Sequence, residues 1–305
     1  MSAVPQPAPA VTVRAPAKVN LHLGVGPLRA DGFHPLDTVY QAVSLYDDVT
    51  VTDARAWSVG VTPVGGVDVN DVPLDDTNIA VRAGRALVAH HGTDRCARIE
   101  VAKGIPVAGG MAGGSADAAA TLVALDRLWD LGTSDDDLLA LAAGLGSDVP
   151  FALLGGTAHG TGRGEVVEPV DDDGTWWWVV VPDDGGLSTP AVYAAFDDLG
   201  GGGGSIGAGA VRAALGTHDA GELGAALRND LEEAALHLRP GLVATRDALR
   251  GAGAVTLLSG SGPTYLGLAR DHEAAHRVRQ ALLDQGLTAV VATGPVAGAH
   301  VVTHG

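Results

Sequence analysis

The chain has 305 residues, of which 46% are hydrophobic, and its formal net charge at pH 7 is −17. This length predicts two domains or one large domain, and the excess of carboxylates argues against binding to nucleic acid or to an anionic membrane surface. The single cysteine, Cys96, excludes an internal disulfide framework and suits a reducing, cytoplasmic compartment. A small anionic substrate is not excluded, because local N–H groups and one cation can hold a phosphate in an acidic protein.

The first half of the chain alternates strand-like and helix-like stretches after a short tail. Residues 1–10 have neither a basic start nor an apolar core and are expected to form a flexible tail, and no apolar run approaches the ~20 residues of a membrane helix. Alternation and β-branched content predict strands at Val11–Ala15, Val19–Val25, Leu36–Leu45, Asp48–Thr52 and Ala97–Lys103, and a shorter strand pair within Val59–Val69. Helical spacing predicts helices at Ile79–His91, Ala116–Trp129 and Leu138–Ala143. Their capping side chains are expected within Asp76–Asn78, at Ser115 and within Ser134–Asp137.

A row of polar side chains alternates with apolar residues on one of these strands. Lys18, Asn20 and His22 share one face of it. Such a row is usually solvated, but it can also line a site. Lys18 and Lys103 are the only two lysines among the 19 Lys and Arg residues. A planar guanidinium cannot imitate a compact ammonium, so a lysine kept in an arginine-rich chain points to a specific role, with chance as the alternative.

A glycine-rich stretch, Pro106–Ala120, lies between a predicted strand and a predicted helix. Glycines let backbone N–H groups approach a phosphate, and the free N–H groups and dipole of a helix start favour an anion. The stretch lacks the Gly-Lys-Ser/Thr ending of P-loop nucleotidases and does not fit the Gly-x-Gly-x-x-Gly pattern of dinucleotide-binding folds. A phosphate-binding loop and an ordinary turn in a chain with 44 glycines both remain open from these residues alone.

Two further positions have both a structural and a functional interpretation. Phe33 and His34 end a loop, where they could stack on and hydrogen-bond a base-like ring or fill a core and make a local hydrogen bond. Asp148 lies in a turn before Pro150. It could cap the short segment Val149–Leu154 or direct its carboxylate into a cleft.

The composition shifts after Val170, where a second unit is predicted to begin. Strands are predicted at Trp176–Val181, Val255–Ser259, Tyr265–Leu268, Ala289–Ala292 and His300–Thr303. Helices are predicted to start near Ser188 and to occupy Ala208–Leu215, Leu223–Leu236, Gly241–Leu249 and Asp271–Gln285. A run of glycines at 200–204 predicts a flexible loop, and Ser259–Thr264 predicts a tight turn between two strands. The second half therefore mixes helices with an antiparallel-compatible sheet.

Five segments, taken together and in order, resemble the GHMP kinases. They are APAKVNL at 15–21, RADGFH at 29–34, PVAGGMAGGSAD at 106–117, LGSDVP at 145–150 and LSGSGPT at 258–264. The resemblance implies a two-domain α+β GHMP kinase architecture. Residues 11–170 would form a ribosomal-S5-domain-2-like domain with the phosphate-binding loop, and residues 171–305 a ferredoxin-like domain. The active site would lie in the cleft between them.

The resemblance also implies a reaction, in which ATP phosphorylates the 2-hydroxyl of 4-diphosphocytidyl-2-C-methyl-D-erythritol in the non-mevalonate (MEP) route to isoprenoids. Asp148 would take the hydroxyl proton beside Lys18, and Asn20, Phe33 and His34 would contact the substrate. Mg²⁺ would arrive with the nucleotide, without a dedicated protein site, and the enzyme would be a monomer or a homodimer. The residues expected to hold the nucleotide are Lys103, Pro106, Val107, Ala108, Gly109, Gly110, Met111, Ala112, Gly113, Gly114, Ser115 and Ala116.

Three residues depart from the pattern of these kinases. Phe33 stands where Tyr is frequent, which keeps stacking but loses a hydroxyl, and Met111 replaces a usual Leu of similar packing. Ala116 replaces a frequent Ser. Two other functions stay open: another small-molecule GHMP kinase, such as homoserine or mevalonate kinase, and a silent nucleotide-binding regulator. The regulator would be expected to lose Lys18 or Asp148, and both are present.

Overall fold

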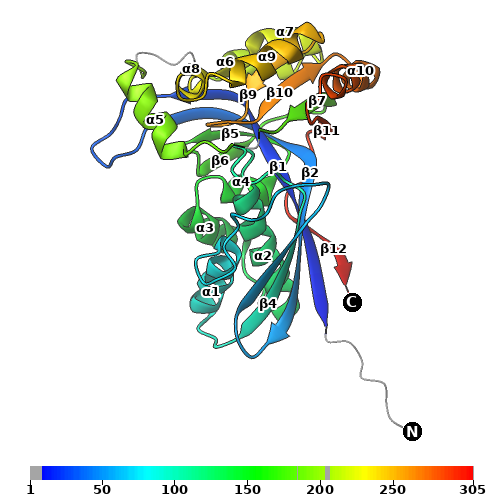
Figure 1. Ribbon diagram of the computed structural model, residues 1–305. Helices are drawn as coiled ribbons and strands as arrows, with labels where there is room; N and C mark the ends of the chain where they lie inside the picture. Colours follow the sequence, from blue (N-terminus) through cyan, green and yellow to red (C-terminus); the bar gives the residue numbers. More distant parts are fainter. Residues whose placement is uncertain (1–8, 184, 203–206, 305) are drawn as a thin grey trace.

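The computed structural model describes residues 9–183, 185–202 and 207–304 and contains two β-sheets with helices packed against them. A narrow lower part is built on the first sheet and a broader upper part on the second (Figure 1). The tail expected at residues 1–10 lies mostly outside the described residues, and Ala10 already belongs to the first strand. Residues 203 and 204 of the loop expected at 200–204 also lie outside them.

The first half of the chain forms most of the first sheet and four helices. Its elements are β1 Ala10–Val25, β2 Leu36–Ala54, β3 Ser58–Pro63, α1 Ile79–His91, β4 Cys96–Lys103, α2 Gly113–Trp129, α3 Asp135–Leu145, α4 Val149–Leu154, β5 Thr157–Thr161 and β6 Val166–Pro169. The interruptions predicted within β1 and β2 are wrong, because register shifts, one of them between Pro16 and Ala17, absorb the irregular residues and let both strands continue. The strand pair expected within Val59–Val69 is wrong too, since β3 is a single strand.

Two of the three predicted helix caps are confirmed. The Asn78 side chain accepts a hydrogen bond from the N–H of Ala80 at 2.9 Å, and the Ser134 hydroxyl accepts one from Asp137 at 3.2 Å. The cap expected at Ser115 is wrong, because α2 already begins at Gly113. The glycine-rich loop thus runs directly into the helix, with no side chain between the loop and the free N–H groups of its first turn.

The second half of the chain forms the second sheet and the remaining helices. Its elements are β7 Trp176–Val181, α5 Thr189–Asp198, α6 Gly209–Leu215, α7 Ala220–Ala226, β8 Arg228–Asn229, α8 Glu232–Leu238, α9 Leu242–Gly251, β9 Val255–Leu258, β10 Tyr265–Ala269, α10 His272–Leu283, β11 Val290–Gly294 and β12 His300–His304. The continuous helix expected at Leu223–Leu236 is wrong. Asn229 interrupts it by donating to the carbonyl oxygens of Leu258 and Gly260, which ties this segment to the β9–β10 turn.

The two sheets are joined by strands that cross from one half of the chain to the other. The main path of the first sheet is β12-β1-β2-β4-β3, with β8 also paired to β1, and the second sheet has the order β11-β7-β10-β9. Between the sheets, the indole N–H of Trp178 on β7 donates to the amide oxygen of Gln41 on β2 at 3.0 Å. The domain boundary expected near Val170 stays a prediction. Two strands that follow Val170 in the sequence, β8 and β12, pair within the first sheet.

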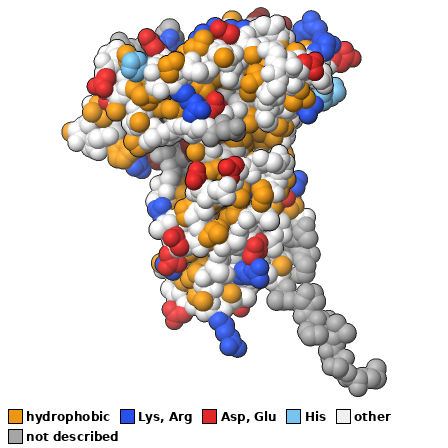
Figure 2. Space-filling model, in the orientation of Figure 1, with side chains coloured by type: hydrophobic (Ala, Val, Ile, Leu, Met, Phe, Trp, Pro, Cys, Tyr) orange, Lys and Arg blue, Asp and Glu red, His pale blue; other side chains and the backbone are white. Residues whose placement is uncertain are grey.

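The surface carries both signs of charge. On the face drawn in Figure 2, acidic and basic side chains are interspersed over the upper and lower parts. Among the described residues, no helix combines the length and apolar character needed to cross a membrane.

The contact that returns the chain from the second sheet to the first can be tested at two adjacent glycines. Gly155 and Gly156 both have positive φ, but a Cβ at Gly155 would overlap the Gly298 backbone, whereas one at Gly156 meets nothing within 4 Å. We expect Gly156→Ala to cost about 1–2 kcal/mol from the left-handed conformation alone. Gly155→Ala should cost about 1–3 kcal/mol more through overpacking.

Thermal unfolding of both variants measures the difference. Gly155→Ala should unfold several degrees below Gly156→Ala, at about 2–4 °C per kcal/mol for a chain of this size. Equal midpoints would contradict the close approach of the two backbones.

Candidate active site

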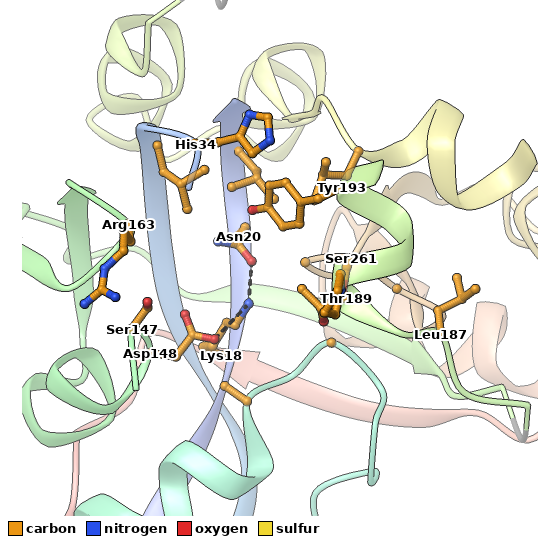
Figure 3. Close-up of a pocket in the computed structure, with 18 of the residues that line it drawn as sticks. Lys18, Asn20, His34, Ser147, Asp148, Arg163, Leu187, Thr189, Tyr193 and Ser261 are labelled. Carbon is orange, nitrogen blue, oxygen red and sulfur yellow. Dashed lines mark hydrogen bonds and ion pairs between the residues drawn. The ribbon is translucent and has the colours of Figure 1, made fainter. Parts of the chain in front are cut away.

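A cavity of about 770 Å³ opens where the two parts of the molecule meet. Figure 3 shows Lys18, Asn20 and Asp148 near its centre and His34 and Tyr193 together toward one end. The cavity is lined by residues of β1, the loop before α2, the start of α4, the β5–β6 turn, α5 and the β9–β10 turn. Segments from both halves of the chain therefore contribute to one site, as expected for the cleft between two domains.

Lys18 is held by a short chain of hydrogen bonds along β1 and β2. Its ammonium donates to the Asn20 amide oxygen at 2.6 Å, and the Asn20 amide nitrogen donates to the Thr38 hydroxyl at 2.8 Å. The Thr38 hydroxyl in turn donates to the backbone carbonyl of His22 at 2.6 Å. Because each side chain in this series of hydrogen bonds has a defined donor or acceptor partner, both Lys18 and Asn20 are oriented before any ligand binds.

Asp148 directs its carboxylate at Lys18, not at the helix that follows it. It occupies the N-cap position of α4 but makes no capping hydrogen bond with its side chain. Its carboxylate lies 3.8 Å from the Lys18 ammonium. The capping role that the sequence left open is therefore absent, and the carboxylate faces the cavity.

Tyr40 completes the surroundings of this pair, and no motif in the sequence pointed to it. Its ring centroid lies 5.8 Å from the Lys18 ammonium. Burial raises the pKa of its phenol well above the usual value, and the charge of Asp148 and a hydrogen bond to it add to the effect. Tyr40 therefore stays a neutral hydrogen-bond donor beside the Asp148 carboxylate.

Two glycine turns from opposite halves of the chain meet beside Lys18. The Lys18 backbone N–H donates to the Met111 carbonyl at 3.1 Å, and the Ser259 hydroxyl donates to the Gly110 carbonyl at 3.1 Å. Gly110 and Gly260 both have positive φ. A Cβ at Gly110 would overlap the Ser259 carbonyl oxygen, and one at Gly260 would lie 3.1 Å from the Lys18 ammonium. The glycines are needed here because backbone packs directly on backbone.

The glycine-rich loop presents part of its length to the cavity. Pro106, Ala108, Gly109, Gly110, Ala112, Gly113 and Gly114 line it. Ala108, Gly110 and Ala112 all have positive φ. Such left-handed residues can turn successive N–H groups toward one point, and the free N–H groups of the first turn of α2 add to them.

Four residues predicted in the loop do not line the cavity. Met111 and Ala116 are fully buried and pack in the core beneath the loop. Val107 and Ser115 are partly exposed but lie outside the lining. The sequence could mark the loop as a unit, but it could not tell which residues of a folded loop face inward.

Lys103, for which a direct nucleotide contact is expected, lies in the structure between two carboxylates outside the cavity lining. It is 2% exposed, does not line the cavity, and donates to Asp47 at 2.5 Å and to Asp117 at 2.7 Å. Burial opposes its charged form, but the two carboxylates outweigh burial and raise its pKa. Asp47 also accepts the N–H groups of Gly104 and Ile105, so the cluster holds the entry to the glycine-rich loop.

Asp117, on α2, is a member of this buried cluster whose charged form is disfavoured by burial. Burial raises its pKa well above the usual value, and the neighbouring Asp47 carboxylate adds to the rise while Lys103 opposes it. Two carboxylates share one ammonium in this cluster, so the cluster depends on Lys103 for its only positive charge among the described residues.

His22, the third member of the polar row on β1, does not reach the cavity. A register shift between Asn20 and His22 ends the simple alternation that placed the three on one face. His22 is buried, its Nε2 has no hydrogen-bond partner among the described residues, and burial lowers its pKa. The row therefore divides into two site residues and one core histidine.

Aromatic residues from two distant segments form the far end of the cavity. His34 stacks against Tyr193 with ring centroids 5.2 Å apart, and its Nδ1 bonds to the Gly26 carbonyl at 2.8 Å. Its Nε2 faces the Asp197 carboxylate at 3.4 Å. Phe33 also lines the cavity and is 48% exposed, so it is not a core residue. Tyr193 and Asp197 lie four residues apart on α5, a spacing that gave no recognisable motif in the sequence.

The comparisons with known proteins agree with this geometry. Residues 78–156 match the model of the GHMP kinases N terminal domain, and residues 211–287 match that of the GHMP kinases C terminal domain. A 4-diphosphocytidyl-2-C-methyl-D-erythritol kinase from a Nocardioides species is 60% identical over 296 residues, covering 96% of this chain and 100% of its own.

Solved structures give the same picture. A crystal structure of 4-(cytidine 5'-diphospho)-2C-methyl-D-erythritol kinase is 33% identical, with a TM-score of 0.75, and the match covers 92% of this chain and 98% of the other. Homoserine kinase from Cytophaga hutchinsonii, at 19% identity and a TM-score of 0.71 over 99% of this chain and 100% of its own, shares the fold alone.

The role of Lys103 can be tested by removing its charge. Lys103→Met leaves Asp47 and Asp117 buried without a cation, so we expect it to lower the free energy of unfolding by about 3–5 kcal/mol. Adding Asp117→Asn should recover part of this loss, because one buried charge is removed. Urea unfolding of both variants provides the measurement. A Lys103→Met protein of unchanged stability that binds ATP weakly would instead restore Lys103 as a nucleotide contact.

Proposed function

The chain belongs to the GHMP kinases and, within them, to the 4-diphosphocytidyl-2-C-methyl-D-erythritol kinases, and on that basis we propose that it transfers the γ-phosphoryl group of ATP to the 2-hydroxyl of 4-diphosphocytidyl-2-C-methyl-D-erythritol. One observation carries the proposal. The Lys18 and Asp148 pair, 3.8 Å apart, lies in one cavity with a glycine-rich loop and with an aromatic end suited to a nucleobase.

In the proposed reaction Asp148 is the general base. An alcohol is a poor nucleophile until a carboxylate accepts its proton during transfer, and Asp148 is the carboxylate nearest to Lys18 in the cavity. The hydroxyl oxygen forms a bond to the γ-phosphorus as the bond to ADP breaks, and the proton goes to Asp148. Lys18 stabilises the ionised carboxylate and the charge that develops on the reacting oxygens.

The residues of the glycine-rich loop suit the triphosphate. The N–H groups of the Ala108–Gly114 segment and of the first turn of α2 would hold its oxygens. When bound, Mg²⁺ would neutralise phosphate charge. The phosphates would supply most of the ligands of Mg²⁺, and the Asp148 carboxylate also lines the cavity.

The aromatic end suits the cytosine of the substrate. Phe33 and Tyr193 both line the cavity there and offer ring faces for stacking. The Nδ1 bond of His34 to Gly26 orients its ring, which leaves Nε2 and the Asp197 carboxylate as acceptors for the exocyclic amine. Burial and the charge of Asp148 raise the pKa of Tyr193, so its hydroxyl stays a donor in the cavity lining.

The sequence departures leave this assignment intact. Phe33 lacks a hydroxyl but keeps its ring in the cavity. Ala116 is fully buried outside the lining, so its methyl group does not touch the space that a ligand would fill. The expectations of a cytoplasmic enzyme and of a monomer or homodimer stay predictions.

Asp148→Asn tests the base directly. It removes the proton acceptor but keeps the shape of the side chain, so kcat should fall about 10²- to 10⁴-fold. The measurement is ADP release from ATP and Mg²⁺, with and without 4-diphosphocytidyl-2-C-methyl-D-erythritol. Asp136→Asn, which changes an exposed carboxylate on α3, is the matched control and should keep normal activity.

Three results are informative. Substrate-dependent release that collapses only in Asp148→Asn supports both the substrate and the base. Release that persists in Asp148→Asn rejects Asp148 as base and leaves the substrate in place. A folded, ATP-binding protein without substrate-dependent release would reject the substrate in favour of another alcohol or of a regulatory role.

The stacking role of Tyr193 predicts a selective effect on the substrate. Tyr193→Ala should raise KM for the cytidine substrate about 10- to 100-fold, because stacking on one base is worth about 1–3 kcal/mol. Tyr193→Phe keeps the ring and should change KM only a few-fold. Steady-state kinetics with each substrate varied in turn provide the test. An equal rise in KM for ATP in Tyr193→Ala would show that the ring orders the whole cavity and has no special role at the base.

A further inference from the structure

The β5–β6 turn contributes one arginine, Arg163, to the lining of the cavity. Glycines on both sides of it, Gly162 and Gly164, have φ values of 72° and 103°. A Cβ at Gly164 would overlap the Tyr40 hydroxyl, so the turn packs directly against Tyr40. Figure 3 shows Arg163 on the same side of the cavity as Ser147. The turn is therefore anchored to the catalytic end of the site.

Arg163 is oriented by the Phe33 ring and by an ion pair with Glu165. Its guanidinium carbon lies 4.9 Å from the centroid of the Phe33 ring, and its Nε lies 3.6 Å from a carboxylate oxygen of Glu165. Glu165 also accepts the backbone N–H of Arg163 at 2.6 Å. Within the described part of the chain the two terminal guanidinium nitrogens make no hydrogen bond, and the side chain is 37% exposed. Four N–H donors are thus available to a ligand in the cavity.

The charges of the lining show why this arginine matters. The lining contains two permanent cations, Lys18 and Arg163, and two carboxylates, Asp148 and Asp197. Lys18 is already engaged with Asn20 and Asp148. The whole chain has a formal charge of −17, so its field repels an anionic substrate unless a cation lies close to the anion.

We propose that Arg163 binds the diphosphate that links the cytidine to the sugar alcohol of the substrate. This inference rests on the proposed function. Arg163 contacts Phe33, which we assign to the nucleobase end, and its turn packs on Tyr40, which lies beside Asp148 at the reacting end. A diphosphate joins the two parts of the substrate that would occupy these ends. A guanidinium fork matches phosphate oxygens with two parallel hydrogen bonds, and the guanidinium can stay over the Phe33 ring while it makes them.

Arg163 would therefore be a determinant of specificity. It strengthens the binding of an alcohol that carries a diphosphate and does not strengthen the binding of a small uncharged alcohol of the same reactivity. The stack on Phe33 also links recognition of the diphosphate to recognition of the base, because a guanidinium held by phosphate would hold the ring in place.

The test compares two ligands that differ only in the diphosphate. Calorimetric titration without ATP measures the binding of cytidine and of cytidine 5'-diphosphate to the wild type, Arg163→Gln and Arg163→Lys. We expect Arg163→Gln to weaken cytidine diphosphate binding roughly 10- to 100-fold and to leave cytidine binding within about 2-fold, as for the loss of a charged hydrogen bond. Arg163→Lys should recover part of the loss, since it keeps the charge but not the fork.

Kinetics and a control variant separate the outcomes. In Arg163→Gln, KM for the substrate should rise and KM for ATP should not change. Arg270→Gln removes an exposed cation paired with Asp271, far from the lining, and should behave as the wild type. Unchanged cytidine diphosphate binding in Arg163→Gln would overturn the inference alone, as would a rise in KM confined to ATP. A wild type that binds neither cytidine nor its diphosphate would overturn the proposed function as well.

Discussion

The site depends on one close approach, that of two backbone turns around the ammonium of Lys18. Gly110 and Gly260 come from opposite halves of the chain, and neither position has room for a Cβ without moving backbone or Lys18. Because the turns touch, Lys18 is only 6% exposed. Its ammonium donates to the Asn20 amide oxygen and pairs with the Asp148 carboxylate at 3.8 Å. A charge held in this way is worth more to a transition state than one that water can screen.

A second ionic cluster, deeper in the first sheet, supports that arrangement. Lys103 joins Asp47 on β2 to Asp117 on α2, and Asp47 also holds two N–H groups where the glycine-rich loop begins. The two lysines of the chain thus occupy different places. Lys18 lines the cavity, and Lys103 links β2 to α2 beside the glycine-rich loop. Buried charges are a weak source of stability, so their value here lies in positioning.

The residues that we propose to recognise the substrate lie in segments that are remote in sequence. Phe33 and His34 lie between β1 and β2, Arg163 lies between β5 and β6, and Tyr193 lies on α5. The cavity brings them into one path from a stacking end to a reacting end. This arrangement explains how a strongly acidic chain could accept a doubly anionic linker, since its few exposed cations need only be in the right place.

The sequence alone determined the family, the two-half α+β organisation and most elements, because five short segments, strand alternation and the Asn78 and Ser134 caps are local signals. Only the tertiary structure decided that β1 and β2 run unbroken, that Asn229 interrupts a helix, and that Lys103 faces two carboxylates and not the cavity. It also brought in Tyr40, Arg163 and Tyr193, which belong to no motif. The reason is physical: periodicity and capping act over a few residues, whereas burial, charge pairing and cavity lining depend on partners supplied by distant parts of the chain.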